Sequence, residues 1–277
     1  MSEQVWFITG ASRGLGQAIA EEALAAGKRV AATARRTEML TELVNKYGDQ
    51  VLPVALDVTD QDQVASAIAH TVEHFGRIDV VVNNAGYANI APIEDFTIED
   101  FRAQVEAVFF GTVLVTKAAL PIMRRQGSGH FIQIASIGGR MTVPGLSAYQ
   151  SAKFAVEGFS GVLRQEVAPL GIKVTVAEPG GMRTDWAGAS MQIPPFQDAY
   201  QPSVGIVVDA LRKGAGNEPI DPAKVGRALL DLAELADPPL HLLLGKDALH
   251  YAAAASEQTS AEDRRWAHVA RSVDFSD

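Results

Sequence analysis

Residues 9–16 read Thr9-Gly10-Ala11-Ser12-Arg13-Gly14-Leu15-Gly16, a turn with three glycines between a short apolar run and an alanine-rich amphipathic stretch. Glycine is needed where the backbone takes a positive φ or lies against a phosphate with no room for a Cβ. A helix beginning near Gly14 directs free N–H groups and the positive end of its dipole at such an anion. A strand, this turn and a helix in succession indicate a dinucleotide-binding site, although the same glycines also fit a purely structural tight turn.

The rest of the chain alternates short apolar runs with longer amphipathic stretches. The apolar runs predict strands at residues 5–9, 29–34, 51–56, 80–82, 131–135 and 172–177. Apolar strands separated by helices predict a parallel sheet covered on both faces, and right-handed crossovers make this a doubly wound, Rossmann-like α/β fold. No linker or repeat interrupts residues 1–277, which we therefore expect to form a single domain.

Three segments carry more specific expectations. Thr37 is placed to cap a helix over residues 37–47. Pro121 is expected to bend or end a long helix over residues 97–123, because proline lacks the N–H that a helix interior uses. Residues 184–217 break the alternation with prolines and scattered apolar side chains, so we expect them to form a lid over a substrate site.

The composition excludes several classes of protein. With 47% hydrophobic and 21% charged residues, the chain is globular rather than disordered. Its net charge of −9 opposes binding to nucleic acid. The absence of cysteine excludes disulfides, thiolate metal sites and cysteine nucleophiles. No apolar run is long enough to span a bilayer and the first residues lack a signal pattern, so we expect a cytoplasmic protein without a membrane partner.

The end of the second predicted strand bears on the choice of nicotinamide cofactor. NAD-binding sheets place a carboxylate there for the ribose 2′-hydroxyl, whereas this strand ends in Arg35 and Arg36, with no acid until Glu38. Arg13 adds a third cation from the glycine turn. Guanidinium groups match the oxygens of a 2′-phosphate, so the pattern favours NADP(H) over NAD. The alternative is that Arg35 and Arg36 are solvated residues at a helix start.

Three polar residues further along can perform acid–base chemistry. Tyr149 and Lys153 are four residues apart on a predicted helix, so their side chains share one face. A nearby ammonium lowers the pKa of a phenol and lets it exchange a proton near neutral pH. Ser136, at the end of the fifth strand, can hydrogen-bond a substrate oxygen. Taken alone, a tyrosine and a lysine at this spacing are also typical of an ordinary helix surface.

These motifs together resemble the short-chain dehydrogenase/reductase family. The matching pieces, in order, are TGASRGLG (9–16), LDVTD (56–60), NNAG (83–86), Ser136, YQSAK (149–153) and EPGGMRTD (178–185). The resemblance implies that Tyr149 exchanges a proton with the carbonyl or alcohol oxygen, that Lys153 binds the nicotinamide ribose and lowers the pKa of the tyrosine, and that Ser136 orients the substrate. It also implies a homodimer or homotetramer.

The same resemblance assigns the cofactor contacts. The phosphates and riboses would be held by Gly10, Ser12, Arg13, Gly14, Leu15, Gly16, Arg35, Arg36, Tyr149 and Lys153. The adenine would be bordered by Asp57 and Val58, the cofactor cleft lined by Asn84, Ala85 and Gly86, and the nicotinamide held by Pro179, Gly180 and Thr184. Asn84 would also brace the neighbouring strand.

One position departs from the family's pattern. Where the family usually has an asparagine three residues before the glycine of the long helix, this chain has Val108, aligned through Gly111. The asparagine props open the helix and helps to hold a water beside the lysine, partly through a backbone carbonyl that valine retains. We therefore expect an active enzyme with an altered proton path.

The substrate site is less specified. Trp186, Met191 and Phe196 form either an apolar substrate wall or the packing of a lid. Residues just beyond the strand ends, where ligands bind in open α/β sheets, predict a pocket rim made by Tyr87, Ile90, Arg140 and Met141.

Metal binding is not expected. His70 and His74 are four residues apart on a predicted helix, a spacing that can serve a metal ion. Histidines on a helix surface are commoner than ligands, and no carboxylate–histidine framework is evident elsewhere in the sequence.

The sequence therefore predicts an NADP(H)-dependent oxidoreductase of the carbonyl reductase type. Hydride transfer would interconvert a ketone or aldehyde with a secondary alcohol, and the apolar lid favours an apolar small-molecule substrate. The alternative is an NADP(H)-binding sensor or scaffold with weak or lost turnover, for which Val108 is the only support. A third possibility, an NAD-linked dehydrogenase, differs in the 2′-phosphate pocket.

Overall fold

A seven-stranded parallel sheet forms the centre of the protein in the computed structural model, which describes residues 4–187 and 191–275. In space the strands run in the order β3-β2-β1-β4-β5-β6-β7, and every neighbouring pair is parallel. Their bounds are β1 (Val5–Ile8), β2 (Arg29–Ala34), β3 (Val51–Ala55), β4 (Val80–Asn83), β5 (Gly129–Ile134), β6 (Ile172–Pro179) and β7 (His241–Leu244). The predicted doubly wound parallel sheet is confirmed.

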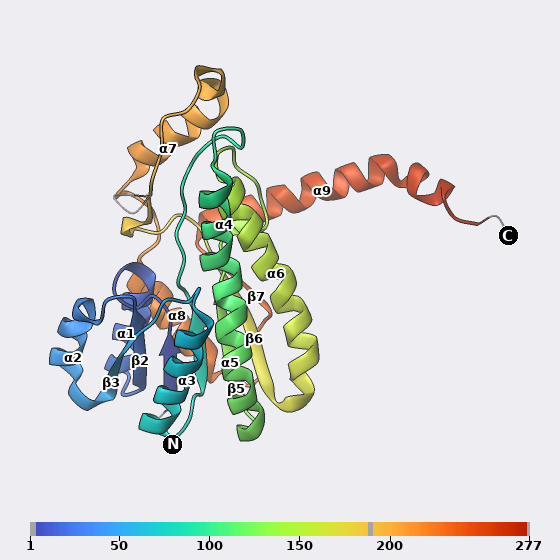
Figure 1. The fold of residues 1–277 in the computed structure, drawn as a ribbon. Coiled ribbons are helices and arrows are strands. Elements are labelled where there is room, and N and C mark those ends of the chain that lie inside the picture. Colours follow the sequence, from blue (N-terminus) through green and yellow to red (C-terminus); the bar gives the residue numbers. More distant parts are fainter. Residues whose placement is uncertain (1–3, 188–190, 276–277) are drawn as a thin grey trace.

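Helices cover both faces of this sheet (Figure 1). The α-helices are α1 (Gly14–Ala25), α2 (Thr41–Tyr47), α3 (Gln61–Phe75), α4 (Ile98–Val105), α5 (Gly111–Gln126), α6 (Ser147–Val167), α7 (Ile206–Gly214), α8 (Pro222–Glu234) and α9 (Lys246–Ser272). On one face α3, α5 and α6 pack over the side chains of Phe7 and Phe131, and on the other α1, α2 and α8 pack over Trp6 and Ile8. Consecutive residues of β1 thus enter opposite layers, as the twofold periodicity of a strand requires.

The strand order reverses between β1 and β4, which are neighbours although β1 begins one half of the sheet and β4 the other. Open α/β sheets bind their ligands at the carboxyl ends of the strands where this reversal occurs. The residues that follow β1 and β4 are the glycine turn 9–16 and the segment 84–86. The topology therefore brings two of the sequence motifs to one place.

Two helix ends differ from the predictions. Thr37 is not a helix cap: it begins a short 3-10 turn, Thr37–Leu40, and α2 begins at Thr41. The fully buried Leu40 packs this turn into the core, which breaks the expected single helix in two. Pro121 does not end its helix, because α5 continues to Gln126. The carbonyl that proline leaves without a donor belongs to Lys117, which is an exposed residue.

The helical run Ile98–Gln126 is, by length and composition, apolar enough to cross a membrane. Glu106 and Lys117 interrupt its apolar residues, which is why the sequence shows no unbroken run of that length. In the fold, one side of α5 buries Val115, Ala119 and Met123 fully against the sheet. α5 is therefore a core helix of the α/β fold, and a helix of this apolar composition suits the core of a protein as well as a membrane.

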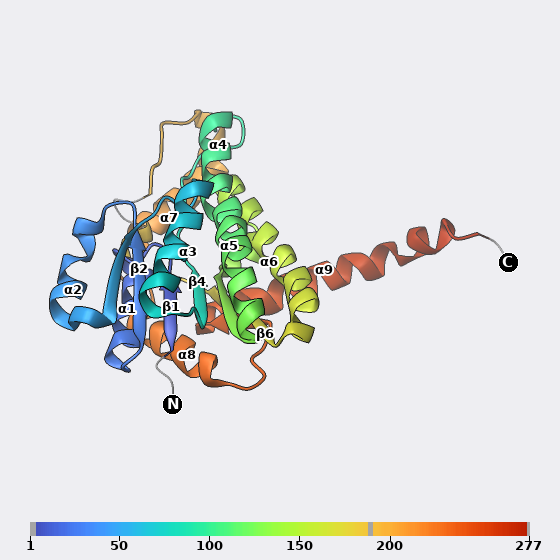
Figure 2. The ribbon, with the colours of Figure 1, turned by 60° about the horizontal axis from the view of Figure 1, so that its bottom comes forward.

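The predicted lid, residues 184–217, contains more regular structure than its prolines suggest. It ends in α7, and its residues 188–190 lie outside the described residues. The charged C-terminal stretch is helical as well: α9 runs over 27 residues and projects away from the sheet (Figures 1 and 2).

Candidate active site

The glycine turn adopts a backbone that side chains would obstruct. Gly10 and Gly14 have φ of +66° and +58°, values that favour glycine. A Cβ on Gly16 would lie 2.2 Å from the carbonyl oxygen of Gly10 and 2.5 Å from Nδ2 of Asn84. Gly16 therefore has to be glycine so that α1 can begin directly against the turn.

Asn84 fastens this turn to the neighbouring strand. Its Nδ2 donates hydrogen bonds to the carbonyl oxygens of Thr9 (2.9 Å) and Gly10 (3.2 Å). In return, the Thr9 hydroxyl oxygen accepts hydrogen bonds from the backbone N–H groups of Asn84 and Ala85, both at 2.9 Å. The bracing role predicted for Asn84 is present, and the side chain of Thr9 is a reciprocal partner that the sequence did not single out.

The beginning of α1 fits the phosphates of a dinucleotide. No side chain caps this end, so the first N–H groups of the helix have no capping partner. Leu15 is buried in the core, which leaves its backbone N–H as its contribution to binding. Arg13 is exposed and lies 3.7 Å from Asp185. The uncapped positive end of a helix, with glycine beside it, is the arrangement that binds phosphate.

The carboxyl end of β2 carries the two arginines predicted to select the cofactor. Arg35 and Arg36 are both exposed. Nη2 of Arg36 lies 3.5 Å from Sδ of Met39, while the charge of Arg35 acts on the Tyr87 phenol and opposes the rise of its pKa that burial causes. Both guanidinium groups therefore remain at the edge of the sheet where a ribose 2′-phosphate would lie.

The end of β3 is ordered by two local contacts. Oδ1 of Asp57 accepts hydrogen bonds from the Thr59 N–H (3.0 Å) and hydroxyl (2.8 Å). Val58 packs against α5 so closely that a Cβ on Gly111 would lie 2.7 Å from its Cγ2. These contacts hold Asp57 and Val58 in place beside the predicted adenine position.

Ser136, Tyr149 and Lys153 meet just beyond the end of β5. Nζ of Lys153 donates a 2.5 Å hydrogen bond to the carbonyl oxygen of Ile134, the last residue of that strand, and lies 5.6 Å from the centre of the Tyr149 ring. A Cβ on Gly138 would contact both Oγ of Ser136 (3.4 Å) and Cε1 of Tyr149 (3.5 Å). Ser136 and Lys153, which are 17 positions apart along the chain, thus form one group with Tyr149, as the resemblance implied.

Burial dominates the proton affinities in this group. It raises the pKa of Tyr149 to about 12, while a hydrogen bond with Ser136 acts in the opposite direction. Burial also lowers the pKa of Lys153 to about 8, and the charge of Glu157 partly offsets this. Burial therefore sets the net direction of the Tyr149 shift, and the lowering of its pKa by Lys153 stays a prediction. The Lys153 ammonium lies over the face of the Tyr149 ring, and burial disfavours its charged form.

Lid residues pack directly on Tyr149. Trp186, Met191 and Phe196 belong to one apolar cluster with Tyr149 and the fully buried Ile90. The Trp186 ring lies 5.4 Å from the tyrosine ring. All three residues named as a substrate wall thus belong to the same apolar cluster as Tyr149, and Trp186 contacts its ring.

The start of the lid is tied to the cofactor end. Thr184 lies next to the glycine turn, 3.7 Å from a Cβ on Gly14, and its hydroxyl accepts a hydrogen bond from the Trp186 N–H at 3.3 Å. Pro179 is the last residue of β6, and the Gly180 N–H donates to the carbonyl oxygen of Leu244 at 3.0 Å. The three residues predicted to hold the nicotinamide therefore line the path from β6 to the turn.

Val108 occupies a widened part of the helix. Residues Glu106–Phe110 form a π-helical turn between α4 and α5, a feature frequent at functional sites. The buried Val108 side chain lies 3.3 Å from a Cβ on Gly86, and its carbonyl oxygen accepts a hydrogen bond from the Thr112 hydroxyl at 3.0 Å. The carbonyl expected to serve a proton path thus already has one partner.

The predicted pocket rim stays a prediction. One of its residues, Arg140, forms an ion pair with the buried Glu178 (2.7 Å). The carbonyl oxygen of Met141 accepts from Nε2 of Gln150 at 2.8 Å, and Oε1 of Gln150 accepts from the Val143 N–H at 2.7 Å. Gln150 therefore fixes the loop before α6. Gln150 was not among the residues selected from the sequence, where its position next to Tyr149 was the feature that could have indicated its role.

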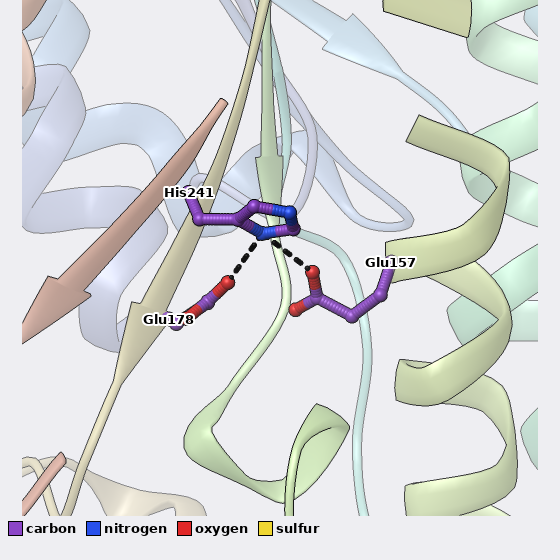
Figure 3. A group of neighbouring side chains, drawn as sticks. All are labelled: Glu157, Glu178 and His241. Carbon is purple, nitrogen blue, oxygen red and sulfur yellow. Dashed lines mark hydrogen bonds and ion pairs between the residues drawn. The ribbon is translucent and has the colours of Figure 1, made fainter. Parts of the chain in front are cut away.

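A carboxylate–histidine group does exist, contrary to expectation. Glu157, Glu178 and His241 come from α6, β6 and β7, and their oxygen and nitrogen atoms lie within 4.8 Å of one another (Figure 3). Of these three residues, only Glu157 could have been recognised from the sequence as a neighbour of the site, because it follows Lys153 by one helical turn on the same face. His70 and His74 instead lie exposed on α3.

Comparison with known proteins gives consistent matches. A family model described as short chain dehydrogenase matches residues 4–192. Oxidoreductase BOA17 of Botryotinia fuckeliana is 58% identical over 264 residues, which cover 95% of this chain and 96% of that protein. The crystal structure of a short-chain dehydrogenase from Streptomyces avermitilis has a TM-score of 0.93 at 40% identity and covers 99% of this chain and 100% of its own. A short chain dehydrogenase from Burkholderia cenocepacia J2315, solved in complex with NADP, has a TM-score of 0.74 at 27% identity, covering 95% and 97%.

Proposed function

Because the chain belongs to the short-chain dehydrogenase family and is an oxidoreductase of that family, we propose that it interconverts a ketone or aldehyde with a secondary alcohol, using NADP(H). The observation that carries this proposal is the meeting of Ser136, Tyr149 and Lys153 beside the lid and the glycine turn. No simple binding protein needs a buried tyrosine and a buried lysine at this point. The alternative of a sensor without turnover is for that reason not favoured.

Tyr149, Ser136 and Lys153 each have a separate role in the proposed reduction. A bound reduced nicotinamide supplies the hydride. The Tyr149 hydroxyl donates its proton to the carbonyl oxygen as negative charge develops there, and Ser136 orients that oxygen by a hydrogen bond. Lys153, held by Ile134, has its Nζ beside the tyrosine ring and would bind the ribose of the cofactor. The high pKa of Tyr149 keeps it protonated, which suits a proton donor for reduction.

The preference for NADP(H) rests on the exposed guanidinium groups at the end of β2. Arg35 and Arg36 stand where NAD-binding sheets carry a carboxylate, and Arg13 is exposed at the start of α1. A neighbour of the same fold binds NADP, as its complex shows. The apolar cluster that contains Trp186, together with Met191 and Phe196, favours an apolar substrate. A homodimer or homotetramer and a cytoplasmic location remain predictions from the sequence.

The test is oxidation of NADPH and NADH in the presence of a panel of apolar ketones and aldehydes. We expect turnover with a preference for NADPH, and a loss of at least about 100-fold in Tyr149→Phe with NADPH binding retained. Tyr251→Phe, on the exposed part of α9, is the matched control and should be fully active. Tight NADPH binding without turnover on any carbonyl would reject the enzyme and favour the sensor.

A further inference from the structure

Asp247, on α9, is joined to the segment that connects β6 to the lid. Its Oδ2 accepts a hydrogen bond from the backbone N–H of Gly181 at 2.7 Å, although the two residues are 66 positions apart in the chain. Asp247 is the acidic residue in the first turn of α9, where the helix dipole stabilises a negative charge. The start of α9 therefore presents a charged acceptor to this segment.

The Asp247 carboxylate occupies the space that a side chain would need at two neighbouring positions. A Cβ on Gly180 would lie 2.3 Å from Oδ2 of Asp247 and 2.4 Å from both its Cγ and its Oδ1. A Cβ on Gly245 would lie 2.6 Å from the same Oδ1. Close packing at such distances leaves no room for a methyl group unless the carboxylate moves. The carboxylate and the two glycines are thus fitted to one another.

Backbone hydrogen bonds hold the same segment from other elements. The Gly180 N–H donates to the carbonyl oxygen of Leu244, at the end of β7, at 3.0 Å. The carbonyl oxygen of Gly181 accepts from the Ile220 N–H at 3.2 Å. Asp247 adds an ionised acceptor to these neutral bonds, and a hydrogen bond to an ionised group is roughly twice as strong as one between neutral groups.

The anchored segment joins the proposed nicotinamide site to the lid. Pro179 and Gly180 come directly before Gly181, and Thr184 follows it, next to the glycine turn. The Thr184 hydroxyl accepts a hydrogen bond from the Trp186 N–H, which begins the lid. A shift of the backbone at Gly181 would therefore move the residues on both sides of it.

We propose that Asp247 is a positioning residue, which holds Gly181 and thereby places the nicotinamide ring for hydride transfer. The inference rests on the proposed carbonyl reduction with NADP(H). Asp247 acts through the backbone of residues 179–184 rather than by touching the cofactor. Arg35 and Arg36, proposed to bind the 2′-phosphate, lie outside this segment. Loss of the anchor should therefore affect the nicotinamide half of the cofactor and spare the adenosine half.

Two substitutions of Asp247 separate the hydrogen bond from the packing. Asp247→Asn keeps an oxygen that can accept from Gly181, whereas Asp247→Leu has the same branched shape without an acceptor. Gly180→Ala provides an independent variant, because its Cβ would displace the carboxylate from Gly181. It should reproduce the effects of Asp247→Leu. Asp263→Leu, at an exposed position on the same helix, is the matched control.

The first test needs neither cofactor nor turnover. Hydrogen exchange should show a protected Gly181 N–H in the wild-type protein and in Asp247→Asn. Exchange at this N–H should be at least about 10-fold faster in Asp247→Leu and in Gly180→Ala, because the hydrogen bond that closes it is lost. Equal protection of Gly181 in Asp247→Leu would show that the carboxylate does not anchor the segment and would overturn the inference.

The second test compares two ligands by titration: NADPH, and adenosine 2′,5′-bisphosphate, which has the 2′-phosphate but no nicotinamide. Asp247→Leu should weaken NADPH binding about 10-fold and binding of the bisphosphate by less than about 2-fold, since a hydrogen bond to a charged group is lost at one end of the site. Asp247→Asn should stay within about 3-fold of the wild-type protein for both. Equal losses for the two ligands, or unchanged NADPH binding, would overturn the inference.

The third test uses the carbonyl compound that the wild-type protein reduces fastest. Asp247→Leu should lower kcat about 10- to 100-fold and change KM for that compound less than about 3-fold, because a displaced nicotinamide slows hydride transfer while the carbonyl site is intact. The isotope effect on kcat with NADPH deuterated at C4 should increase, since hydride transfer then limits the rate more fully. A wild-type kcat and isotope effect in Asp247→Leu would contradict the positioning role.

The outcomes distinguish this inference from the proposed function. A wild-type protein that binds NADPH but reduces no carbonyl would overturn the proposed reduction, and the two titrations would still decide whether Asp247 places the nicotinamide. A wild-type protein that reduces carbonyls, with Asp247→Leu and Gly180→Ala equal to it in exchange, binding and turnover, would overturn the inference alone.

Discussion

The indole of Trp186 lies against the phenol of Tyr149, with ring centroids 5.4 Å apart and ring planes inclined at 57°. This contact joins the start of the lid to the proposed proton donor on α6. Trp186 thereby contributes to the burial that raises the pKa of Tyr149 to about 12. The lid therefore does more than enclose a substrate, because its position also sets how strongly the tyrosine holds its proton.

Replacing Trp186 by alanine should expose Tyr149. The pKa of the phenol should fall towards its ordinary value, so the rise of alcohol oxidation with pH should move to lower pH. Loss of the apolar surface should raise KM for an apolar substrate about 10-fold. The measurement is the pH dependence of kcat and KM for oxidation. Trp266→Ala, at an exposed position on α9, is the control, and equal profiles for both variants would show that Trp186 does not shield the tyrosine.

The double variant Arg35→Ser/Arg36→Ser should discriminate between cofactors. Losing the guanidinium partners of a 2′-phosphate should weaken NADPH binding about 10- to 100-fold and leave NADH binding unchanged. Titration by cofactor fluorescence measures both affinities. Arg124→Ser/Arg125→Ser, in the last turn of α5, makes the same change in net charge at a distance and should affect neither cofactor. Equal losses for NADPH and NADH would contradict the assignment.

Gly16→Ala should damage both folding and cofactor binding. The added Cβ would meet the Gly10 carbonyl at 2.2 Å, so the turn or α1 has to move, which costs about 1–3 kcal/mol in the free energy of unfolding. Gly158→Ala is the matched control, since a Cβ there meets nothing within 4 Å and alanine favours a helix. Urea unfolding and NADPH titration should separate the two variants. Similar values for both would show that the turn tolerates a side chain.

Val108→Asn tests the expected change of proton path. The new amide would enter a buried position beside Gly86 in the π-helical turn, where it would offer a polar group that valine lacks. We expect turnover and its pH profile to change, measured against Val162→Asn at an exposed position on α6. If turnover and pH profile matched those of the wild-type protein, Val108 would have no part in proton transfer.

His130 should make the protein sensitive to acid. It is buried on β5, where Nε2 lies 3.0 Å from Oγ1 of Thr175, and burial lowers its pKa from 6.5 to about 3. Between these values the unfolded chain binds a proton that the folded chain does not. Stability is therefore present above pH 6.5 and is lost as the pH falls towards 3, by up to about 1.4 kcal/mol per pH unit.

Urea unfolding at pH 7.5 and pH 5 measures this loss. His130→Gln should be less stable than the wild-type protein at pH 7.5 but should lose less stability on acidification. His70→Gln, on the exposed surface of α3, should keep the wild-type dependence. An unchanged pH dependence in His130→Gln would assign the acid sensitivity to other groups.

Much of the fold follows from local patterns in the sequence. A buried strand of a parallel sheet is a short apolar run, so β1 to β6 were predictable to within one or two residues. Pro121 misled because its effect depends on which side of the helix faces water, and Thr37 because a buried Leu40 a few residues away outweighed its capping tendency. Propensity acts locally, and packing overrides it.

The sequence by itself determined the order of the strands and helices, the glycine turn, and the Tyr149–Lys153 pair, because each depends on residues a few positions apart. Only the tertiary structure decided that Trp186 covers Tyr149 and that Glu157, Glu178 and His241 share one site. It also decided the pKa of Tyr149, which burial raises above its ordinary value. These properties arise from burial and from contacts between distant segments, which no local pattern encodes.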